Sequence, residues 1–379
     1  MDEKRKGLND RAIRVGIVGA GGIAEVHAGI LKVLPEVELV AVADFDYSKA
    51  VAFQKRYGLK AAFDSVRSMA ACELDAVHVL TPPHTHAAAT IECLEQGWHA
   101  FVEKPFAVSP AECENMKRAA ALYGRKVGVN HNLTFTPSYL TMLDAIRNCR
   151  LGEIQHAVVV YNFPLRRLET GMPGHWMFRN PGNLLLEVGP HPASTLQLLM
   201  GRVQQAATAV STAVTLGSGA TIYRRWQSSL VCERGTAQFF FSGDADYKDG
   251  WITVIGQDGA ATVDLLRDTV TITEKSRFSP AVDNLRVAAV NSRSLLANSI
   301  RGYREYFKRF LGSKTSGDPY YLGMIGSIRA FHQALKAGTP PPIGLDDGAM
   351  VVEYCDAMIR SGHEFLAQSK DHEGYVAIE

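Results

Sequence analysis

The sequence predicts an α/β protein in two parts: an N-terminal doubly wound parallel sheet, and a C-terminal α+β domain with a large, predominantly antiparallel sheet. The 379 residues are enough for two domains at roughly 150 residues each. Strands alternate with helices up to about Val129, as in a parallel sheet with helical crossovers. Beyond that point β-rich runs follow one another with little helix between them. We therefore expect domains at residues 1–132 and 133–379.

The N-terminal part alternates apolar, β-forming runs with helix-like stretches. The runs are nearly continuously apolar, which is typical of parallel strands covered by helices on both faces. The predicted strands are Ile13–Val18, Val37–Ala43, Ala76–Leu80, His99–Val102 and Lys126–Val129. The predicted helices are Ile23–Leu34, Ser48–Tyr57, His86–Gln96 and Pro110–Tyr123. Ser109 as N-cap, Pro110 at the first helical position and Gly124 at the C-terminal stop delimit the last helix.

The C-terminal part begins with a helix-like stretch, Tyr139–Arg147, and continues with strands separated by Gly and Asp turns. The predicted strands are Gln155–Tyr161, Ala206–Val214, Trp226–Cys232, Ala237–Ser242, Trp251–Ile255, Ala261–Asp264 and Thr269–Thr273. Residues 275–320 are more polar and partly basic, and we interpret them as a surface excursion with an amphipathic helix. A helix at 346–360 is expected to pack back on the N-terminal domain.

Composition and charge exclude several classes of protein. Lys plus Arg number 40 and Asp plus Glu 39, so the strong basic excess of an electrostatic nucleic-acid binder is missing. The six cysteines form no CxxC pair and no Cys/His cluster, which argues against a disulfide scaffold and against a metal site. No apolar run approaches the ~18 residues of a membrane span, and the N-terminus lacks the apolar core of a signal peptide. We expect a cytoplasmic protein with no nucleic-acid or membrane partner.

A glycine-rich loop follows the first predicted strand, with the sequence Gly19-Ala20-Gly21-Gly22-Ile23-Ala24. In a dinucleotide-binding turn the first glycine makes the tight turn and the second lets the backbone approach the pyrophosphate. The small third residue allows close packing of helix on strand, and the helix N-terminus faces the anion. The loop therefore predicts a Rossmann domain whose cofactor site includes Gly19, Gly21, Gly22, Ile23 and Ala24.

Asp44 ends the second predicted strand about 20 residues after the glycine loop. A carboxylate there would accept hydrogen bonds from the adenosine ribose hydroxyls. Phe45 follows in place of a basic residue and Asp46 adds negative charge, so a 2′-phosphate would be repelled. NAD is therefore favoured over NADP, although Asp44 could also be an ordinary turn residue at the strand end.

Four further motifs, taken together, are specific enough to indicate a resemblance to a known family. They are Leu80-Thr81-Pro82-Pro83-His84-Thr85-His86, Glu103-Lys104-Pro105, Asn132 with Phe135 and Pro137, and the segment from Gly182 to His191, GNLLLEVGPH. Together they resemble the glucose–fructose oxidoreductase/inositol dehydrogenase (Gfo/Idh/MocA) family over about Ile13–Ser361. The resemblance implies a substrate held between the two domains and NAD(P)-dependent hydride exchange at a secondary alcohol of a sugar, nucleotide sugar or cyclitol.

The resemblance also implies roles for single residues. Lys104 is the active-site lysine beside the nicotinamide, and His191 matches the catalytic histidine. Glu187 stands where the family usually has Asp, Ser194 where a second Asp is common, and Thr134 where many members have Arg. Thr81, Pro82, His86, Glu103 and Lys104 complete the expected cofactor site. His86 can instead be a structural residue of the helix after Thr85.

The chemistry requires a base that removes the alcohol proton, and histidine titrates in the right range. Lys104 could stabilise the developing alkoxide or act as the base itself. We favour His191 as base and Lys104 as electrostatic stabiliser, and the sequence leaves this division open. Glu187 and His191 are four residues apart, so on one helix they share a face and the carboxylate would hold the imidazole. Alternatively Glu187 only adds charge to the start of its helix.

The expected substrate contacts come from both domains: Lys104, Asn132, Arg166, Trp176, Glu187 and His191. Arginines and an aromatic side chain before Glu187 could grip a carboxylate, a diphosphate or a sugar face, or could form a merely exposed charged loop. Two alternative functions stay open: a redox-assisted hydrolase or epimerase that recycles its NAD, and an NAD(H)-binding redox sensor without turnover. A large sheet with a partly apolar outer face predicts a homodimer or homotetramer.

Overall fold

The computed structural model describes residues 8, 11–165, 175–310 and 319–370. The chain divides into two compact units. The first unit is residues 1–132 with residues 323–352, and the second is mainly residues 133–311 with residues 353–379. Within the described ranges, no helix is long and apolar enough to cross a membrane.

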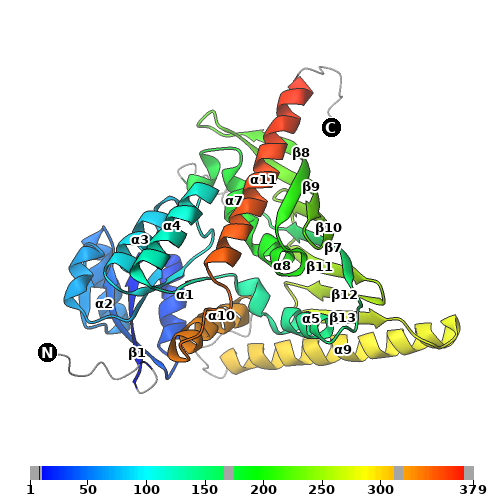
Figure 1. Cartoon of the computed structure of the whole chain (residues 1–379), viewed down its shortest axis with the longest axis horizontal. Helices are drawn as coiled ribbons and strands as arrows, with labels where there is room; N and C mark the ends of the chain where they lie inside the picture. The colour runs from blue at the N-terminus through cyan, green and yellow to red at the C-terminus, as the bar shows by residue number, and fades with distance from the viewer. Residues whose placement is uncertain (1–7, 9–10, 166–174, 311–318, 371–379) are drawn as a thin grey trace. The chain divides into compact units, whose positions relative to one another are not determined.

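The first unit is built on a six-stranded parallel sheet (Figure 1) with the strand order β3-β2-β1-β4-β5-β6. Its strands are β1 (Ile13–Val18), β2 (Val37–Ala43), β3 (Ala61–Phe63), β4 (Ala76–Val79), β5 (His99–Val102) and β6 (Val127–Val129). Strand order reverses between β1 and β4, and open α/β sheets bind ligands beyond the carboxyl ends of the strands at such a point. β3 was not among the strands predicted from the sequence, because three residues are too few to show periodicity.

The helices of the first unit follow the strands in the expected alternation. They are α1 (Gly22–Leu31), α2 (Tyr47–Tyr57), α3 (His86–Glu95) and α4 (Pro110–Tyr123), with α3 and α4 side by side (Figure 1). The predicted caps of α4 are confirmed, since Ser109 Oγ accepts the Glu112 amide at 3.3 Å and Gly124 is left-handed at φ 60°. Two longer helices come late in the chain, α10 (Pro319–Lys336) and α11 (Leu345–Lys370). α10 was not predicted from the sequence, and α11 is longer than the predicted helix at 346–360.

The second unit is built on a seven-stranded sheet in the order β13-β12-β11-β7-β10-β9-β8. Its strands are β7 (Ile154–Asn162), β8 (Val203–Thr215), β9 (Thr221–Cys232), β10 (Gly235–Ser242), β11 (Asp249–Gly256), β12 (Gly259–Asp264) and β13 (Thr269–Glu274). The sheet is mixed, because β7 and β10 run parallel while the other neighbours are antiparallel. The prediction of a predominantly antiparallel sheet is confirmed.

Helices cover one face and one edge of this second sheet. Alternate residues such as Val159, Phe239 and Ile252 are fully or almost fully buried, so the core lies on one face. The helices are α5 (Pro137–Arg147), α7 (Asn183–Val188), α8 (Pro190–Met200) and α9 (Pro280–Phe310). Helix α9, inside the segment expected as a surface excursion, runs along the edge strand β13 (Figure 1).

Candidate functional site

The glycine loop joins β1 to α1 in the geometry that its residue types predict. Gly19 has φ 98°, and a Cβ there would lie 2.8 Å from the backbone of Leu80, so a side chain would be strained. Gly21 and Gly22 are exposed, and a Cβ on either would meet nothing within 4 Å. No side chain caps the N-terminus of α1, and Ala24 is fully buried behind it. The loop thus offers open backbone amides at a helix start, which fits a pyrophosphate.

Asp44 follows β2 and ties the glycine loop to the next strand. Its carboxylate accepts the Ala20 amide at 2.7 Å and the Asp46 amide at 2.9 Å. Asp46 caps α2, since its side chain accepts the Ser48 amide, and Phe45 is 87% exposed. Each carboxylate oxygen has a second lone pair, so Asp44 can hold the loop and still accept from ribose hydroxyls.

Three neighbouring strands end at the same edge of the first sheet. Gly19 follows β1, Thr81 comes soon after β4, and Lys104 comes soon after β5, in the spatial order β1-β4-β5. The Leu80 amide donates to the Val18 carbonyl at 2.8 Å, which fixes the β4 exit beside the glycine loop. Lys104 is half-buried. The predicted cofactor residues of the first unit are thus brought together at the switch point.

His86, at the start of α3, connects two of these exits. Its Nε2 lies 2.8 Å from the Thr81 carbonyl and its Nδ1 lies 2.8 Å from the Pro105 carbonyl. Burial lowers the pKa of His86, although both carbonyl contacts favour the protonated ring. This geometry fits a structural role for His86, in which its ring holds the backbone near Thr81 and the backbone near Lys104 together.

Glu103, next to Lys104, is a buried carboxylate with several donors. It accepts from His27 Nε2 at 2.9 Å, from Asn130 Nδ2, and from the Lys104 amide at 3.1 Å. Burial opposes its ionisation, yet the contacts with His27 and Asn130 lower the pKa of Glu103 to about 2. The ionised carboxylate therefore fixes the backbone on which Lys104 stands.

A group of buried histidines stands behind Glu103, and the sequence analysis did not predict it. His27 Nδ1 lies 2.7 Å from His78 Nδ1, and the His78 ring stacks on His332 of α10 at 5.2 Å. Burial, with the neighbouring histidines, lowers the pKa of His78 well below its ordinary value. Burial also lowers the pKa of His332 to about 4. The one signal in the sequence was a histidine within an otherwise apolar strand, Ala76–Val79.

The second unit holds the other predicted catalytic residues. Glu187 lies near the end of α7 and His191 at the start of α8, with Gly189 between the two helices and Pro190 as the first residue of α8. Glu187 and His191 thus lie in two successive helices, because Pro190 has no amide hydrogen with which to continue the α7 ladder, although Gly189 keeps helical dihedrals at φ −57° and ψ −31°. Both residues are half-buried, and the His191 ring meets the edge of Tyr320 at 6.2 Å.

Trp176 gives the clearest contact of this region, since its indole Nε1 donates to Glu187 Oε2 at 2.9 Å. Nothing in the sequence paired these two residues. The Ser194 hydroxyl donates to the His191 carbonyl at 2.7 Å, so Ser194 stabilises the first turn of α8. Asn132 is buried, and Arg179 is exposed. Arg166 and Arg167 lie outside the described residues.

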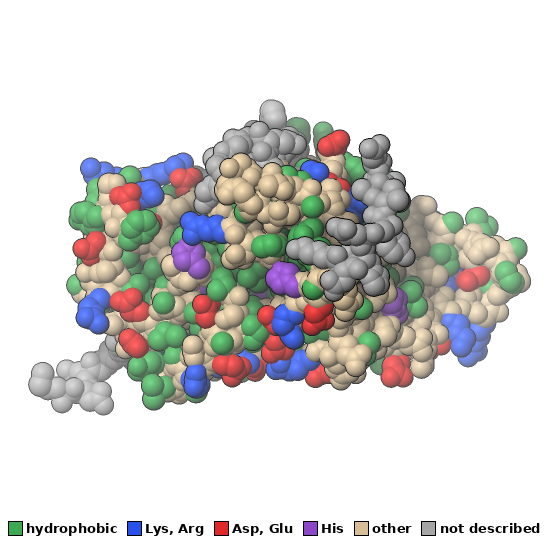
Figure 2. All heavy atoms as spheres, turned by 90° about the horizontal axis from the view of Figure 1, so that it is seen from above, with side chains coloured by type: hydrophobic (Ala, Val, Ile, Leu, Met, Phe, Trp, Pro, Cys, Tyr) green, Lys and Arg blue, Asp and Glu red, His purple; other side chains and the backbone are tan. Residues whose placement is uncertain are grey.

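The surface charge is mixed in sign. On the face shown in Figure 2, acidic and basic side chains are interspersed. This distribution agrees with the near-zero formal charge of +1.

Comparison with known proteins identifies the first unit. Residues 13–131 match the family model GFO_IDH_MocA, which is described as an oxidoreductase family with an NAD-binding Rossmann fold. Over these residues the first unit is therefore similar to the NAD-binding domain of the Gfo/Idh/MocA oxidoreductase family. This match confirms the predicted resemblance to the family and the predicted Rossmann fold of the first unit.

Curated relatives match over about half of the chain. The D-glucoside 3-dehydrogenase of Escherichia coli is 30% identical over 203 residues, which is 52% of this chain and 56% of that protein. An inositol 2-dehydrogenase of Rhizobium meliloti is 27% identical over 200 residues, 52% of this chain and 58% of that protein. The match therefore spans less than two thirds of these relatives.

Solved structures share the fold over nearly the whole chain. The WlbA dehydrogenase of Bordetella pertussis, in complex with NADH and UDP-GlcNAcA, superposes with a TM-score of 0.75 at 20% identity. The alignment covers 94% of this chain and 97% of that one. A levoglucosan dehydrogenase in complex with NADH superposes with a TM-score of 0.75 at 17% identity. The alignment covers 94% of this chain and 98% of that one. The two-sheet architecture is therefore that of known dehydrogenases.

Proposed function

We propose that this protein is an NAD-dependent oxidoreductase that transfers a hydride between a nicotinamide cofactor and a secondary alcohol of a sugar, nucleotide sugar or cyclitol. The observation that carries the proposal is the meeting of the glycine loop, Thr81 and Lys104 at one sheet edge. The relatives named D-glucoside 3-dehydrogenase and inositol 2-dehydrogenase support an alcohol of this class.

We propose that NAD is bound by the first unit and preferred to NADP. The open amides after Gly21 would hold the pyrophosphate, and Asp44 would accept from the ribose hydroxyls. Asp44 and Asp46 place two carboxylates at the end of β2, where the phosphate of NADP would meet repulsion.

The proposed chemistry divides between Lys104 and His191. Bound NAD would accept the hydride from the alcohol carbon. Lys104 would donate to the alcohol oxygen and stabilise its developing negative charge, from a backbone fixed by Glu103 and His86. His191 would take the alcohol proton, with Glu187 as a positioning residue held by the Trp176 indole.

We further propose a cytoplasmic homo-oligomer, formed through the open face of the second sheet. Trp251, Val160 and Phe240 are cross-strand neighbours on β11, β7 and β10, and all three are partly exposed on that face. A row of large apolar side chains on a sheet face favours a covering partner. No disulfide joins any of the six cysteines, all of which lie in the described ranges, and this agrees with a reducing compartment.

A substrate panel tests the proposed function. Purified protein is incubated with NAD and with single sugars, nucleotide sugars and inositols, and NADH is followed by absorbance. We expect NADH formation with at least one alcohol, and less NADPH when NADP replaces NAD. Conversion of a substrate without net NADH would support the NAD-recycling enzyme instead, and NAD binding without any turnover would support the sensor.

A further inference from the structure

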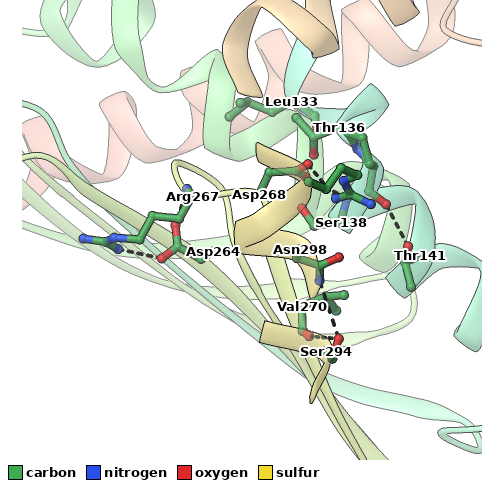
Figure 3. A network of polar contacts seen from close by, with 12 residues as sticks. Leu133, Thr136, Ser138, Thr141, Asp264, Arg267, Asp268, Val270, Ser294 and Asn298 are labelled. Carbon is green, nitrogen blue, oxygen red and sulfur yellow. Dashed lines mark hydrogen bonds and ion pairs between the residues drawn. The ribbon is translucent and has the colours of Figure 1, made fainter. Parts of the chain in front are cut away.

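Helix α9 is amphipathic, but its polar face packs against the protein and its apolar face is exposed to solvent. Asn291 Oδ1 accepts the Ile272 amide at 3.2 Å, and Ser294 Oγ donates to the Val270 carbonyl at 3.1 Å. Arg301 donates to the buried Asp268 at 2.9 Å. Figure 3 shows Ser294 and Asn298 turned toward the β13 region. Residues 291, 294, 298 and 301 are three or four apart, so they share one face of the helix.

This polar face covers the edge of the second sheet. β13 is the edge strand, and side chains of α9 satisfy an amide and a carbonyl of its backbone. Asp268, which is left-handed at φ 51°, also accepts the Ser138 amide at 2.8 Å, so it joins α9 to the start of α5 (Figure 3). The orientation of α9 about its own axis is therefore fixed by several hydrogen bonds.

The opposite face of α9 carries a narrow apolar stripe, which we call the α9 seam. Its members are Val282, Leu285, Ala289, Leu296, Ile300, Tyr303 and Phe307. The six large side chains are between 50% and 74% exposed. At 100° per residue the seam spans only about 60° of the helix surface, opposite Asn291 and Ser294.

The spacing of the seam fits a second helix. Successive members are 3, 4, 7, 4, 3 and 4 residues apart, which is the period of a coiled-coil seam. A helix lying in a membrane interface presents a much broader apolar face. The 31 residues of α9 give a seam on a rod about 46 Å long.

The exposed area fits a dimer. Two aromatic side chains of roughly 200 Å² and four aliphatic ones of roughly 100 Å², each a half to three quarters exposed, sum to on the order of 500 Å². A standard interface buries about 800 Å² per partner, of which some 65% is apolar in homodimers. The seam supplies about this apolar area from one copy.

We propose that the α9 seam is a self-association surface, on which α9 of a second copy of this chain packs antiparallel. The antiparallel orientation sets the N-terminus of each α9 beside the C-terminus of the other, so the two helix dipoles attract each other. Because the same surface of both copies is used, a twofold axis relates them and the pairing gives a closed dimer and not a filament. The open sheet face proposed above is a separate surface, so the two together make a tetramer.

The mass in solution tests the proposal. Leu296→Glu with Ile300→Glu places charges in the seam, and Val290→Glu is the matched control, since Val290 is 53% exposed but lies off the seam. We expect light scattering to give half the wild-type mass for the double variant and an unchanged mass for the control. An unchanged mass for the double variant, with wild-type circular dichroism, would overturn the proposal. A second outcome would also overturn it: the wild type binds phosphatidylserine vesicles, and the double variant no longer binds them although its mass in solution is unchanged. The seam would then be a membrane-binding surface.

Cross-linking tests the register without charged substitutions. In an antiparallel pair centred on the seam, position 289 of one copy lies opposite position 300 of the other. With Cys149→Ser as background, Ala289→Cys chains mixed with Ile300→Cys chains should form disulfide-linked heterodimers on oxidation. Failure to link across copies would contradict the antiparallel pairing, whether or not the substrate panel shows NADH formation.

Discussion

Replacing His332 with phenylalanine should make the protein less sensitive to acid. His332 is fully buried between His78 and Phe331, and burial lowers its pKa from 6.5 to about 4. A histidine held neutral in the folded state contributes stability that is fully present above pH 6.5. That stability is lost as the pH falls toward 4, because the unfolded chain binds the proton first.

The magnitude follows from the width of this window. Each pH unit is worth at most about 1.4 kcal/mol per group, and titration is only partial at both ends of the window, so His332 costs the wild type about 2 kcal/mol between pH 6.5 and 4.5. His332→Phe keeps an aromatic ring beside His78 and removes the titration. It also removes the hydrogen bond to the Ile328 carbonyl, which should cost about 1 kcal/mol at pH 7.

Urea unfolding at pH 7 and pH 4.5, followed by circular dichroism, measures the effect. We expect the variant to be slightly less stable than the wild type at pH 7 and more stable by about 1 kcal/mol at pH 4.5. His363→Gln, at an exposed site on α11, should follow the wild type at both values. The reasoning is refuted if His332→Phe loses as much stability as the wild type between the two pH values.

Three further predictions concern the cofactor, the core and the proposed base. Asp44→Ala should weaken NAD more than NADP by calorimetry, because the ribose hydroxyls lose their acceptor, and an unchanged NAD affinity would exclude that role. Gly128→Ala should lower the melting temperature by the equivalent of about 1–3 kcal/mol, since the new Cβ would lie 2.5 Å from Phe331, and an unchanged melting temperature would show that the ring moves freely. Glu187→Gln should reduce kcat less than removal of His191 and shift the pH–rate profile to lower pH, whereas an unshifted profile would separate Glu187 from the base.

Local patterns in the sequence predicted most of the first unit. Glycine spacing, caps and apolar runs act over a few residues, so the loop at Gly19 and the helix from Pro110 to Tyr123 could be predicted directly. The short edge strand Ala61–Phe63 could not, because its pairing with β2 depends on tertiary structure. The parallel pairing of β7 with β10 could not be predicted either, because it depends on the order of the strands in the sheet and not on local sequence patterns.

The candidate site was predicted where a motif carries the chemistry, and missed where residues distant in sequence meet. Asp44 and Lys104 lie just after two strands whose C-terminal ends were predicted from the sequence. The contact of Trp176 with Glu187 and the stack of His78 on His332 depend on which helices pack together. The division between α7 and α8 falls at Gly189-Pro190, which the sequence shows, whereas the four-residue spacing of Glu187 and His191 was interpreted as that of one helix.

The most direct test of the account is the effect of Lys104→Ala and His191→Ala on turnover of an alcohol identified by the substrate panel. The account predicts that each substitution lowers kcat by about 10²-fold or more, the scale of general acid–base assistance, while NAD affinity measured by calorimetry hardly changes. The double variant should lose less than the product of the single losses, because both groups act on one proton. Wild-type turnover by His191→Ala would contradict its assignment as the base, and wild-type turnover by both variants would contradict the proposed site.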